Sequence, residues 1–232
     1  MKKAMIFDLD GTLSDSIHSI KYCADQALAT VGFGPFDVEQ YYYFIGDGAA
    51  NLIKRALLAG GDEKQDPADG KNCTTDGNTP KHFEVAYQAY REIFKDYCMY
   101  QVKPYDGIVE LLAALKELGI KLAVLSNKPH AETIRVVEDL FGKDCFDEIQ
   151  GQMEGVAIKP NPEGGVRILE KFGIAPEDTL YLGDTGTDML TGKALGAFTI
   201  GALWGFRKRD ELEEHGADVI IGHPLEVLNY IG

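Results

Sequence analysis

Four short segments of the sequence carry side chains that could together act on a phosphate ester. They are Asp8-Leu9-Asp10-Gly11-Thr12, Ser126-Asn127-Lys128, Lys159-Pro160 and Gly183-Asp184-Thr185-Gly186-Thr187-Asp188. Asp8 and Asp10 are two residues apart, so their carboxylates repel each other unless a proton or a cation lies between them. Asp184 and Asp188 add two more carboxylates. Such an oxygen-rich set favours Mg²⁺ as the bound ion.

The other polar groups of these segments suit a phosphoryl group. Lysine and serine side chains bind phosphate oxygens, and Gly11 and Thr12 offer backbone amides. With Mg²⁺ present, one carboxylate can attack phosphorus and form an aspartyl-phosphate. A second carboxylate two residues away can protonate the leaving alkoxide and afterwards activate water. The pattern therefore favours phosphate-ester hydrolysis with Mg²⁺ as cofactor.

Each segment taken alone also has an ordinary structural explanation. The first segment could be an acidic turn, Ser126 could cap a helix, and Lys159 could be a solvated charge. Asp184 and Asp188 could simply lie near the positive end of a helix dipole. However, each segment follows a predicted strand or the loop beyond one, and ligands of doubly wound sheets bind beyond the carboxyl ends of the strands. We therefore expect the four segments to form one site.

The elements that must position these residues alternate along most of the chain. Short, mostly apolar runs predict strands at 4–7, 122–125, 147–150, 179–182, 198–200 and 219–221. Amphipathic segments separate them, such as the one in which Ile108, Leu111 and Leu115 recur at helical spacing before Gly119. This alternation predicts an α/β fold, a doubly wound parallel sheet with a Rossmann-like core.

Residues 15–100 interrupt this alternation with helical patterns. An aromatic stripe predicts one helix there, formed by Phe83, Tyr87, Tyr90, Phe94 and Tyr97. It favours a small helical core, with a substrate-stacking surface as the alternative. Gly61–Pro80 lacks large apolar residues and is predicted to be a long loop or a partly disordered insertion between two helices. The predicted domains are thus an α/β core of residues 1–14 and 101–232 and a helical domain of residues 15–100 inserted after the first strand.

Charge and cysteine content limit the classes of partner. The 232 residues include 23 Lys and Arg against 37 Asp and Glu, a formal charge of −14. Such a chain repels phosphate backbones, so we expect no nucleic-acid partner. Its four cysteines lie far apart, and its longest apolar stretches are too short for a membrane span or a signal peptide. We expect a cytoplasmic monomer or homodimer whose partner is a small anionic phosphate ester.

The four segments resemble the motifs of the haloacid dehalogenase-like hydrolase superfamily, and the resemblance covers essentially the whole chain. It implies that Asp8 is the nucleophile and Asp10 the general acid and base. It also implies that Mg²⁺ is held by the carboxylates of Asp8 and Asp184 and the backbone carbonyl of Asp10, with Asp188 acting through water. The implied phosphate-binding residues are Gly11, Thr12, Ser126, Asn127 and Lys159. The helical insertion lies where this superfamily carries a cap domain that selects substrates.

Within the superfamily the chain is most similar to phosphoglycolate phosphatases. The similarity lies in Asp15-Ser16, in Ile45-Gly46-Asp47-Gly48 and in Ser126-Asn127-Lys128-Pro129. It implies that Gly46, Asp47 and Gly48 form a cap loop facing the substrate's non-reacting end, although a plain helix-start turn is an equal alternative. Ala49 stands where mutase relatives carry an arginine, which argues against a mutase. True dehalogenases lack the second aspartate of the first motif, so the presence of Asp10 argues against dehalogenation.

We therefore expect a phosphoric monoester hydrolase, with 2-phosphoglycolate as the leading substrate. The same chemistry on pyrophosphate, a nucleoside monophosphate or a sugar phosphate is the first alternative. A more remote alternative is a non-catalytic binding protein of the phospho-receiver kind. A receiver needs neither the inserted domain nor an acid and base beside its phosphorylated aspartate, so both features argue against it.

Overall fold

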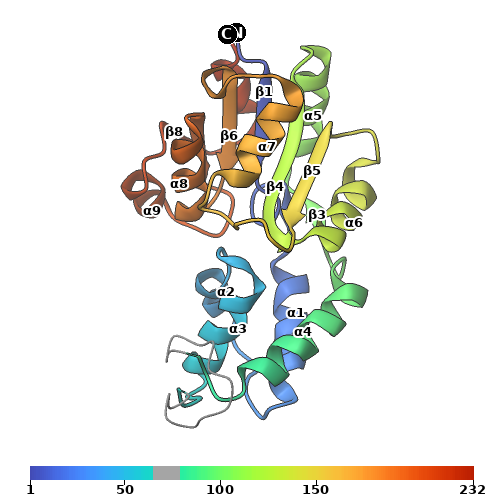
Figure 1. Ribbon diagram of the computed structural model, residues 1–232, viewed down its shortest axis with the longest axis vertical. Helices are drawn as coiled ribbons and strands as arrows, with labels where there is room; N and C mark the ends of the chain where they lie inside the picture. The colour runs from blue at the N-terminus through green and yellow to red at the C-terminus, as the bar shows by residue number, and fades with distance from the viewer. Residues whose placement is uncertain (65–78) are drawn as a thin grey trace. The chain divides into compact units, whose positions relative to one another are not determined.

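The computed structural model describes residues 1–64 and 79–232. Most of the predicted loop Gly61–Pro80 therefore lies outside the described residues. The chain divides into two compact units, one of residues 1–16 and 102–232 and one of residues 17–101 (Figure 1). The first unit contains the sheet and the second is helical.

A six-stranded parallel sheet forms the centre of the first unit, in the order β5-β4-β1-β6-β7-β8. The strands are β1 (Ala4–Phe7), β4 (Lys121–Pro129), β5 (Glu148–Gln152), β6 (Thr179–Gly183), β7 (Phe198–Ala202) and β8 (Val219–Ile221). All six predicted strands are present. The first strand lies between β4 and β6, so the strand order reverses at β1. This is the predicted doubly wound α/β fold.

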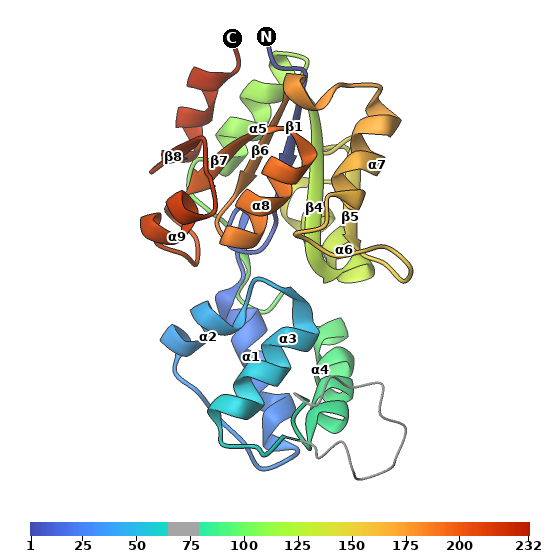
Figure 2. The same cartoon turned by 60° about the vertical axis from the view of Figure 1, so that its left-hand side comes forward.

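Helices cover both faces of the sheet (Figure 2). On one face α7 (Glu163–Phe172) and α8 (Gly186–Leu195) pack on alternate residues of the strands, among them Ile6, Leu125 and Tyr181. Because strand side chains alternate between faces, Phe7 points to the opposite face, where it contacts Phe146. Helix α5 (Ile108–Glu117) lies on that side and buries its apolar stripe, as its spacing predicted.

Shorter elements complete this unit. They are α6 (His130–Phe141), α9 (Arg209–Glu214), the 3₁₀ helices η2 (Pro176–Asp178) and η3 (Pro224–Tyr230), and a two-stranded ribbon of β2 (Ser14–Asp15) and β3 (Lys103–Pro104). The ribbon joins the segments that leave for the helical unit and return from it.

The register of the sheet brings the strand ends to one edge. Phe7, the last residue of β1, is paired with Val124 of β4 and with Leu182 of β6. Parallel pairing gives the strands one direction, so the residues that follow each pair emerge at the same edge. Asp8 and Asp184 therefore come together although they are far apart in sequence.

The strand that carries Ser126 is longer than predicted. The apolar run ends at Leu125, but β4 continues to Pro129, and α6 begins only at His130. Ser126 thus lies within the strand and not beyond it, nor does it cap the helix. The pairing with β5 shifts between Leu125 and Pro129, where β4 carries more residues than its partner. Such an irregularity re-aims side chains next to a site, which an apolar pattern cannot reveal.

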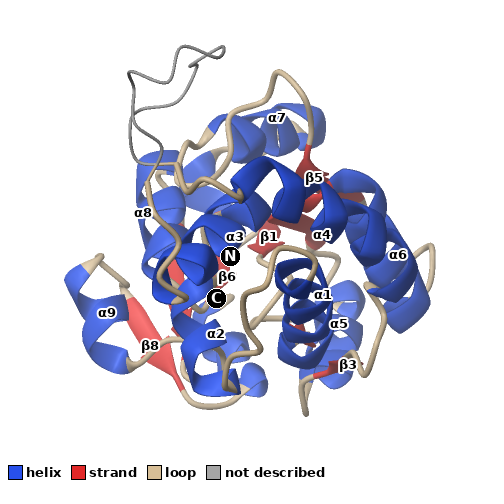
Figure 3. Cartoon of the chain, turned by 90° about the horizontal axis from the view of Figure 1, so that it is seen from below, coloured by secondary structure: helices blue, strands red, loops and turns tan. Residues whose placement is uncertain are grey.

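Among the described residues, the second unit contains α1 (Ile17–Ala29), α2 (Val38–Phe44), α3 (Gly48–Ala59) and α4 (Phe83–Tyr97) (Figure 3). Three members of the aromatic stripe of α4 are buried: Phe83, Tyr90 and Phe94. Neighbouring rings along the stripe stack, with 5.1 Å between the centroids of Tyr90 and Phe94. Most of the stripe is therefore core, while Tyr97 is 45% exposed.

Candidate active site

A cluster of three buried carboxylates lies at the carboxyl edge of the sheet. Oxygen atoms of Asp8, Asp184 and Asp188 lie within 4.8 Å of one another. Asp8 follows β1, Asp184 follows β6, and Asp188 lies in the first turn of α8. Parallel strands and one strand-to-helix turn thus bring together three of the four predicted acids.

A buried lysine, Lys159, lies against this cluster. Nζ of Lys159 donates hydrogen bonds of 2.7 Å to Oδ1 of Asp8 and of 2.7 Å to Oδ1 of Asp188. The lysine is 4% exposed, so it is not the solvated surface charge that a lone lysine usually is. Burial makes these charge-assisted bonds stronger than their equivalents in water.

Charge within the cluster is only partly balanced. Burial raises the pKa of Asp8 well above its usual range, with a further rise from Asp188 against the pull of Lys159. Burial also raises the pKa of Asp184 to about 7. Burial lowers the pKa of Lys159, but attraction to Asp188 and Asp8 outweighs it and raises that pKa well above its ordinary value. Negative charge in excess of one lysine is the condition that a bound cation relieves.

The chemistry of the donors fits Mg²⁺. Hard oxygen ligands from carboxylates are the ones that this ion prefers, and the cluster offers three of them. Asp8, Asp184 and Asp188 would hold the ion. Oδ1 of Asp10 lies 2.8 Å from Nζ of Lys128. The family resemblance assigns the backbone carbonyl of Asp10 to the metal, and not its carboxylate.

Two groups fix the Asp184 carboxylate, one at each oxygen. The hydroxyl of Thr12 donates to Oδ1 over 2.9 Å, and the backbone N–H of Phe206 donates to Oδ2 over 2.7 Å. Gly11 has a φ of +90°, and a Cβ built there would lie 2.4 Å from Oδ2 of Asp184. Gly11 and Thr12, predicted to bind phosphate, therefore also shape the position of Asp184.

Asp188 combines a structural role with its place in the site. Its Oδ2 accepts hydrogen bonds from the backbone N–H and the hydroxyl of Thr185, which caps α8. Its Oδ1 accepts from Lys159. The two explanations offered for this residue, a helix-start acid and a site residue, thus apply to different oxygens of one carboxylate.

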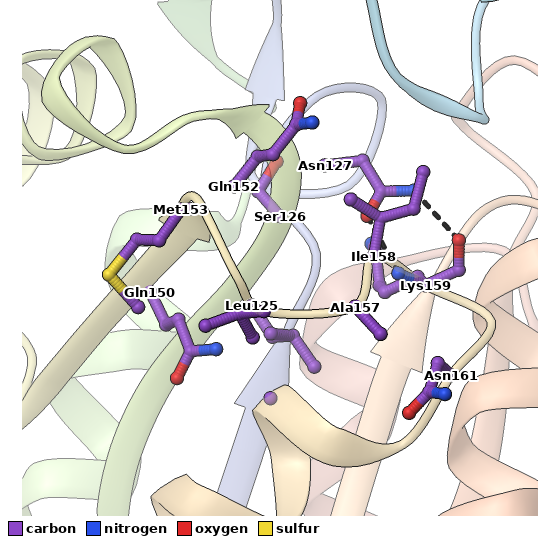
Figure 4. A pocket seen from close by; sticks show the side chains of 13 residues that line it. Leu125, Ser126, Asn127, Gln150, Gln152, Met153, Ala157, Ile158, Lys159 and Asn161 are labelled. Atoms are coloured by element: carbon purple, nitrogen blue, oxygen red, sulfur yellow. Dashed lines mark hydrogen bonds between the residues drawn. The ribbon is translucent and has the colours of Figure 1, made fainter. Parts of the chain in front are cut away.

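Asn127 links the second motif to the third. Its Oδ1 accepts from the backbone N–H of Lys159 over 2.9 Å, and its Nδ2 donates to the backbone carbonyl of Lys159 over 3.1 Å. Ser126, Asn127 and Lys159 line a pocket together with side chains that include Gln152, Met153, Ala157 and Ile158 (Figure 4). The Asn127 amide therefore holds the main chain of Lys159 at this pocket. This structural role differs from the phosphate binding that the sequence predicts for Asn127.

Two residues outside the four sequence segments also contact the site. Tyr181 is fully buried in β6, and its hydroxyl lies 3.4 Å from Oδ1 of Asp188. The indole of Trp204 donates to the backbone carbonyl of Thr12 over 3.0 Å. Both come from apolar stretches that looked like core. Lys128 belongs to the second segment, but the sequence pattern predicts no role for it.

The predicted loop Gly46-Asp47-Gly48 belongs to the helical unit. Gly46 and Gly48 both have positive φ, and Asp47 immediately precedes α3. The Asp47 carboxylate forms an ion pair with Arg55, whose guanidinium also donates to the backbone carbonyl of Phe44 over 3.0 Å. Arg55 thus ties together both sides of the turn that begins α3.

Among residues 1–64 and 79–232, no helix is long and apolar enough to cross a membrane.

Comparison with known proteins agrees with this geometry. Residues 5–202 match the family model of the haloacid dehalogenase-like hydrolases. A phosphoglycolate phosphatase from Aquifex aeolicus is 31% identical over 97% of this chain and 95% of its own. The N-acetylmuramic acid 6-phosphate phosphatase of Pseudomonas aeruginosa is 26% identical over 99% of this chain and 94% of its own.

A crystal structure from Lactobacillus delbrueckii subsp. bulgaricus, assigned as a phosphoglycolate phosphatase, superposes with a TM-score of 0.88. It is 30% identical and covers 100% of this chain and 99% of its own. The chain therefore belongs to the haloacid dehalogenase-like hydrolase family, as a phosphoglycolate phosphatase-like enzyme of the phosphoric monoester hydrolase class.

Proposed function

We propose that the protein is a Mg²⁺-dependent phosphatase that hydrolyses 2-phosphoglycolate through an aspartyl-phosphate on Asp8. The observation that carries this proposal is the placement of Lys159 between the buried carboxylates of Asp8 and Asp188. A carboxylate held by a lysine beside two further acids is suited to approach phosphorus, because the lysine and a cation offset the charge of the ester.

In the first step Asp8 attacks the phosphorus and the bond from phosphorus to the ester oxygen breaks. Asp10 gives its proton to the leaving alkoxide. In the second step Asp10 takes a proton from water, and that water attacks the phosphorus of phospho-Asp8. Inorganic phosphate leaves and the Asp8 carboxylate is regenerated. Lys159 and Ser126 hold the phosphoryl oxygens during both steps.

Mg²⁺ at Asp8, Asp184 and Asp188 would neutralise charge on the phosphoryl oxygens and so allow one anion to approach another. The protein's own contribution is to hold the carboxylates in place: Thr12 and the backbone of Phe206 hold Asp184, Thr185 holds Asp188, and Lys159 holds Asp8.

The proposed substrate rests on the relatives named phosphoglycolate phosphatase. We assign the inserted residues 15–100 as the cap domain, with Gly46, Asp47 and Gly48 as the loop that selects the substrate. One relative of comparable coverage is named for a sugar phosphate, N-acetylmuramic acid 6-phosphate. A sugar phosphate is therefore the second candidate substrate.

The test is phosphate release from 2-phosphoglycolate and from N-acetylmuramic acid 6-phosphate, each with Mg²⁺ and with EDTA. A Mg²⁺-dependent kcat/KM above about 10⁴ M⁻¹s⁻¹ for 2-phosphoglycolate supports the proposal. A higher value for the sugar phosphate retains the chemistry and replaces the substrate. Equal rates in Mg²⁺ and EDTA contradict the role assigned to the carboxylate cluster.

A further inference from the structure

Each acid of the Asp8-Leu9-Asp10 segment has its own buried lysine. Lys159 binds Asp8, and Nζ of Lys128 donates a 2.8 Å hydrogen bond to Oδ1 of Asp10. The Lys128 side chain is 2% exposed and that of Asp10 is 14% exposed. A lysine is rarely buried to this degree without a specific partner, so this pair requires an explanation beyond surface charge.

The backbone around Lys128 is held on several sides. Its N–H donates to the hydroxyl of Ser126 over 3.2 Å, and its carbonyl accepts from the hydroxyl of Thr133 over 3.1 Å. A Cβ built on Gly151 of β5 would lie 2.7 Å from that carbonyl, so only glycine permits this close packing. Lys128 thus projects from a firmly anchored part of β4 toward Asp10.

We propose that Lys128 is a positioning residue for proton transfer by Asp10. Its ammonium holds Oδ1, which fixes the rotation of the carboxyl group and assigns the transferred proton to Oδ2. The proposal rests on the proposed function, in which Asp10 donates a proton to the leaving alkoxide and later accepts one from water. The same oxygen serves both steps, because Oδ1 stays with Lys128.

This role predicts a dependence on the leaving group. An alkoxide such as glycolate is a poor leaving group and needs the proton from Asp10, whereas p-nitrophenolate is stable as an anion and leaves without it. Loss of Lys128 should therefore slow hydrolysis of 2-phosphoglycolate far more than hydrolysis of p-nitrophenyl phosphate. A lysine that served only to bind phosphate or to stabilise the fold would affect both esters alike.

The experiment compares Lys128→Met with Lys121→Met, which removes an exposed lysine from the same strand. For Lys128→Met we expect kcat on 2-phosphoglycolate to fall by about 10²-fold and kcat on p-nitrophenyl phosphate by less than about threefold. Lys121→Met should leave both values unchanged. Lys128→Gln, which can still donate to Asp10, should lose less than Lys128→Met and serves if the methionine variant does not fold.

A double-mutant cycle with Asp10→Asn decides whether Lys128 acts through Asp10. If it does, adding Lys128→Met to Asp10→Asn causes no further loss on 2-phosphoglycolate. Additive losses, or equal losses on the two esters, overturn the positioning role while leaving the phosphatase proposal intact. A wild-type protein that hydrolyses neither ester overturns both.

Discussion

The backbone N–H of Phe206 donates a 2.7 Å hydrogen bond to Oδ2 of Asp184. This bond connects the loop after β7 to an acid that follows β6, and it fixes one oxygen of a proposed metal ligand. Neighbouring Gly205 lies so close that a Cβ there would be 2.3 Å from Cβ of Asp184 and 2.4 Å from the carbonyl of Gly11. The loop after β7 is therefore part of the site, although it contains no motif residue.

Replacing Gly205 should disturb the metal site. In Gly205→Ala the added methyl group must displace Asp184 or the loop, so we expect the Mg²⁺ concentration for half-maximal activity to rise by about tenfold. Titration of activity with Mg²⁺ measures this. Gly222→Ala is the control, because a Cβ there meets only Glu226 at 3.7 Å. An unchanged Mg²⁺ requirement in Gly205→Ala would count against this role of the loop.

Asp8→Asn should remove the nucleophile without harming the fold. We expect kcat to fall by at least about 10⁴-fold, in line with loss of a nucleophile in other enzymes. Burial and then the repulsion from Asp188 raise the pKa of Asp8, so the charged carboxylate is unfavourable in the metal-free fold. The variant with a neutral amide should therefore be at least as stable as the wild type when metal is absent. Phosphate release and thermal unfolding in EDTA provide the two measurements. Activity within tenfold of wild type would refute the assignment.

Lys159→Met should destabilise the protein as well as inactivate it. The change leaves Asp8 and Asp188 buried without their shared cation, and breaking a buried ion pair costs about 3–5 kcal/mol. Lys121→Met breaks only the exposed pair with Asp147 and should cost less than about 1 kcal/mol. Urea unfolding of both variants in EDTA checks the difference, and equal costs would contradict it.

The metal-free protein should lose stability as the pH rises. Burial raises the pKa of Asp184 from 3.8 to about 7. A carboxyl with a raised folded-state pKa contributes stability at low pH and loses it as the pH rises through the folded-state value. In EDTA we therefore expect the unfolding temperature to fall between about pH 4 and about pH 7 and to level off above that.

Asp184→Asn provides the check on this pH effect. The amide does not ionise, so its unfolding temperature should depend less on pH over the same range, while Asp210→Asn on the exposed side of α9 should behave as wild type. Added Mg²⁺ should stabilise the wild type most at the higher pH, where the carboxylates are ionised. Identical pH profiles for wild type and Asp184→Asn would exclude Asp184 as the cause.

Arg55→Met tests the proposed cap loop. Loss of the guanidinium removes the ion pair with Asp47 and the hydrogen bond to the carbonyl of Phe44, so we expect KM for 2-phosphoglycolate to rise by about tenfold with little change for p-nitrophenyl phosphate. The ion pair is partly exposed, so the free energy of unfolding should change by less than about 1 kcal/mol. Arg91→Met on the exposed side of α4 is the control. A parallel change for both esters would show that the loop does not select substrates.

The sequence alone was sufficient for the sheet and for much of the acidic site. Short apolar runs determine strands locally, and a parallel sheet brings their carboxyl ends to one edge whatever the loops contain. The positions of Asp8 and Asp184 follow from that rule, and the short turn from β6 into α8 adds Asp188. Asp8 and Asp184 directly follow the last residues of β1 and β6, so the sheet leaves their main-chain positions little freedom.

Other features were decided only by the tertiary structure. The irregular pairing of β4 extends the strand past Ser126 and directs Lys128 to Asp10. The path of the loop after β7 brings Phe206 to Asp184. These contacts join segments distant in sequence through single hydrogen bonds, and their geometry depends on how strands and loops pack. Residue type and spacing determine which groups can carry out the chemistry, whereas packing determines which partner each group receives.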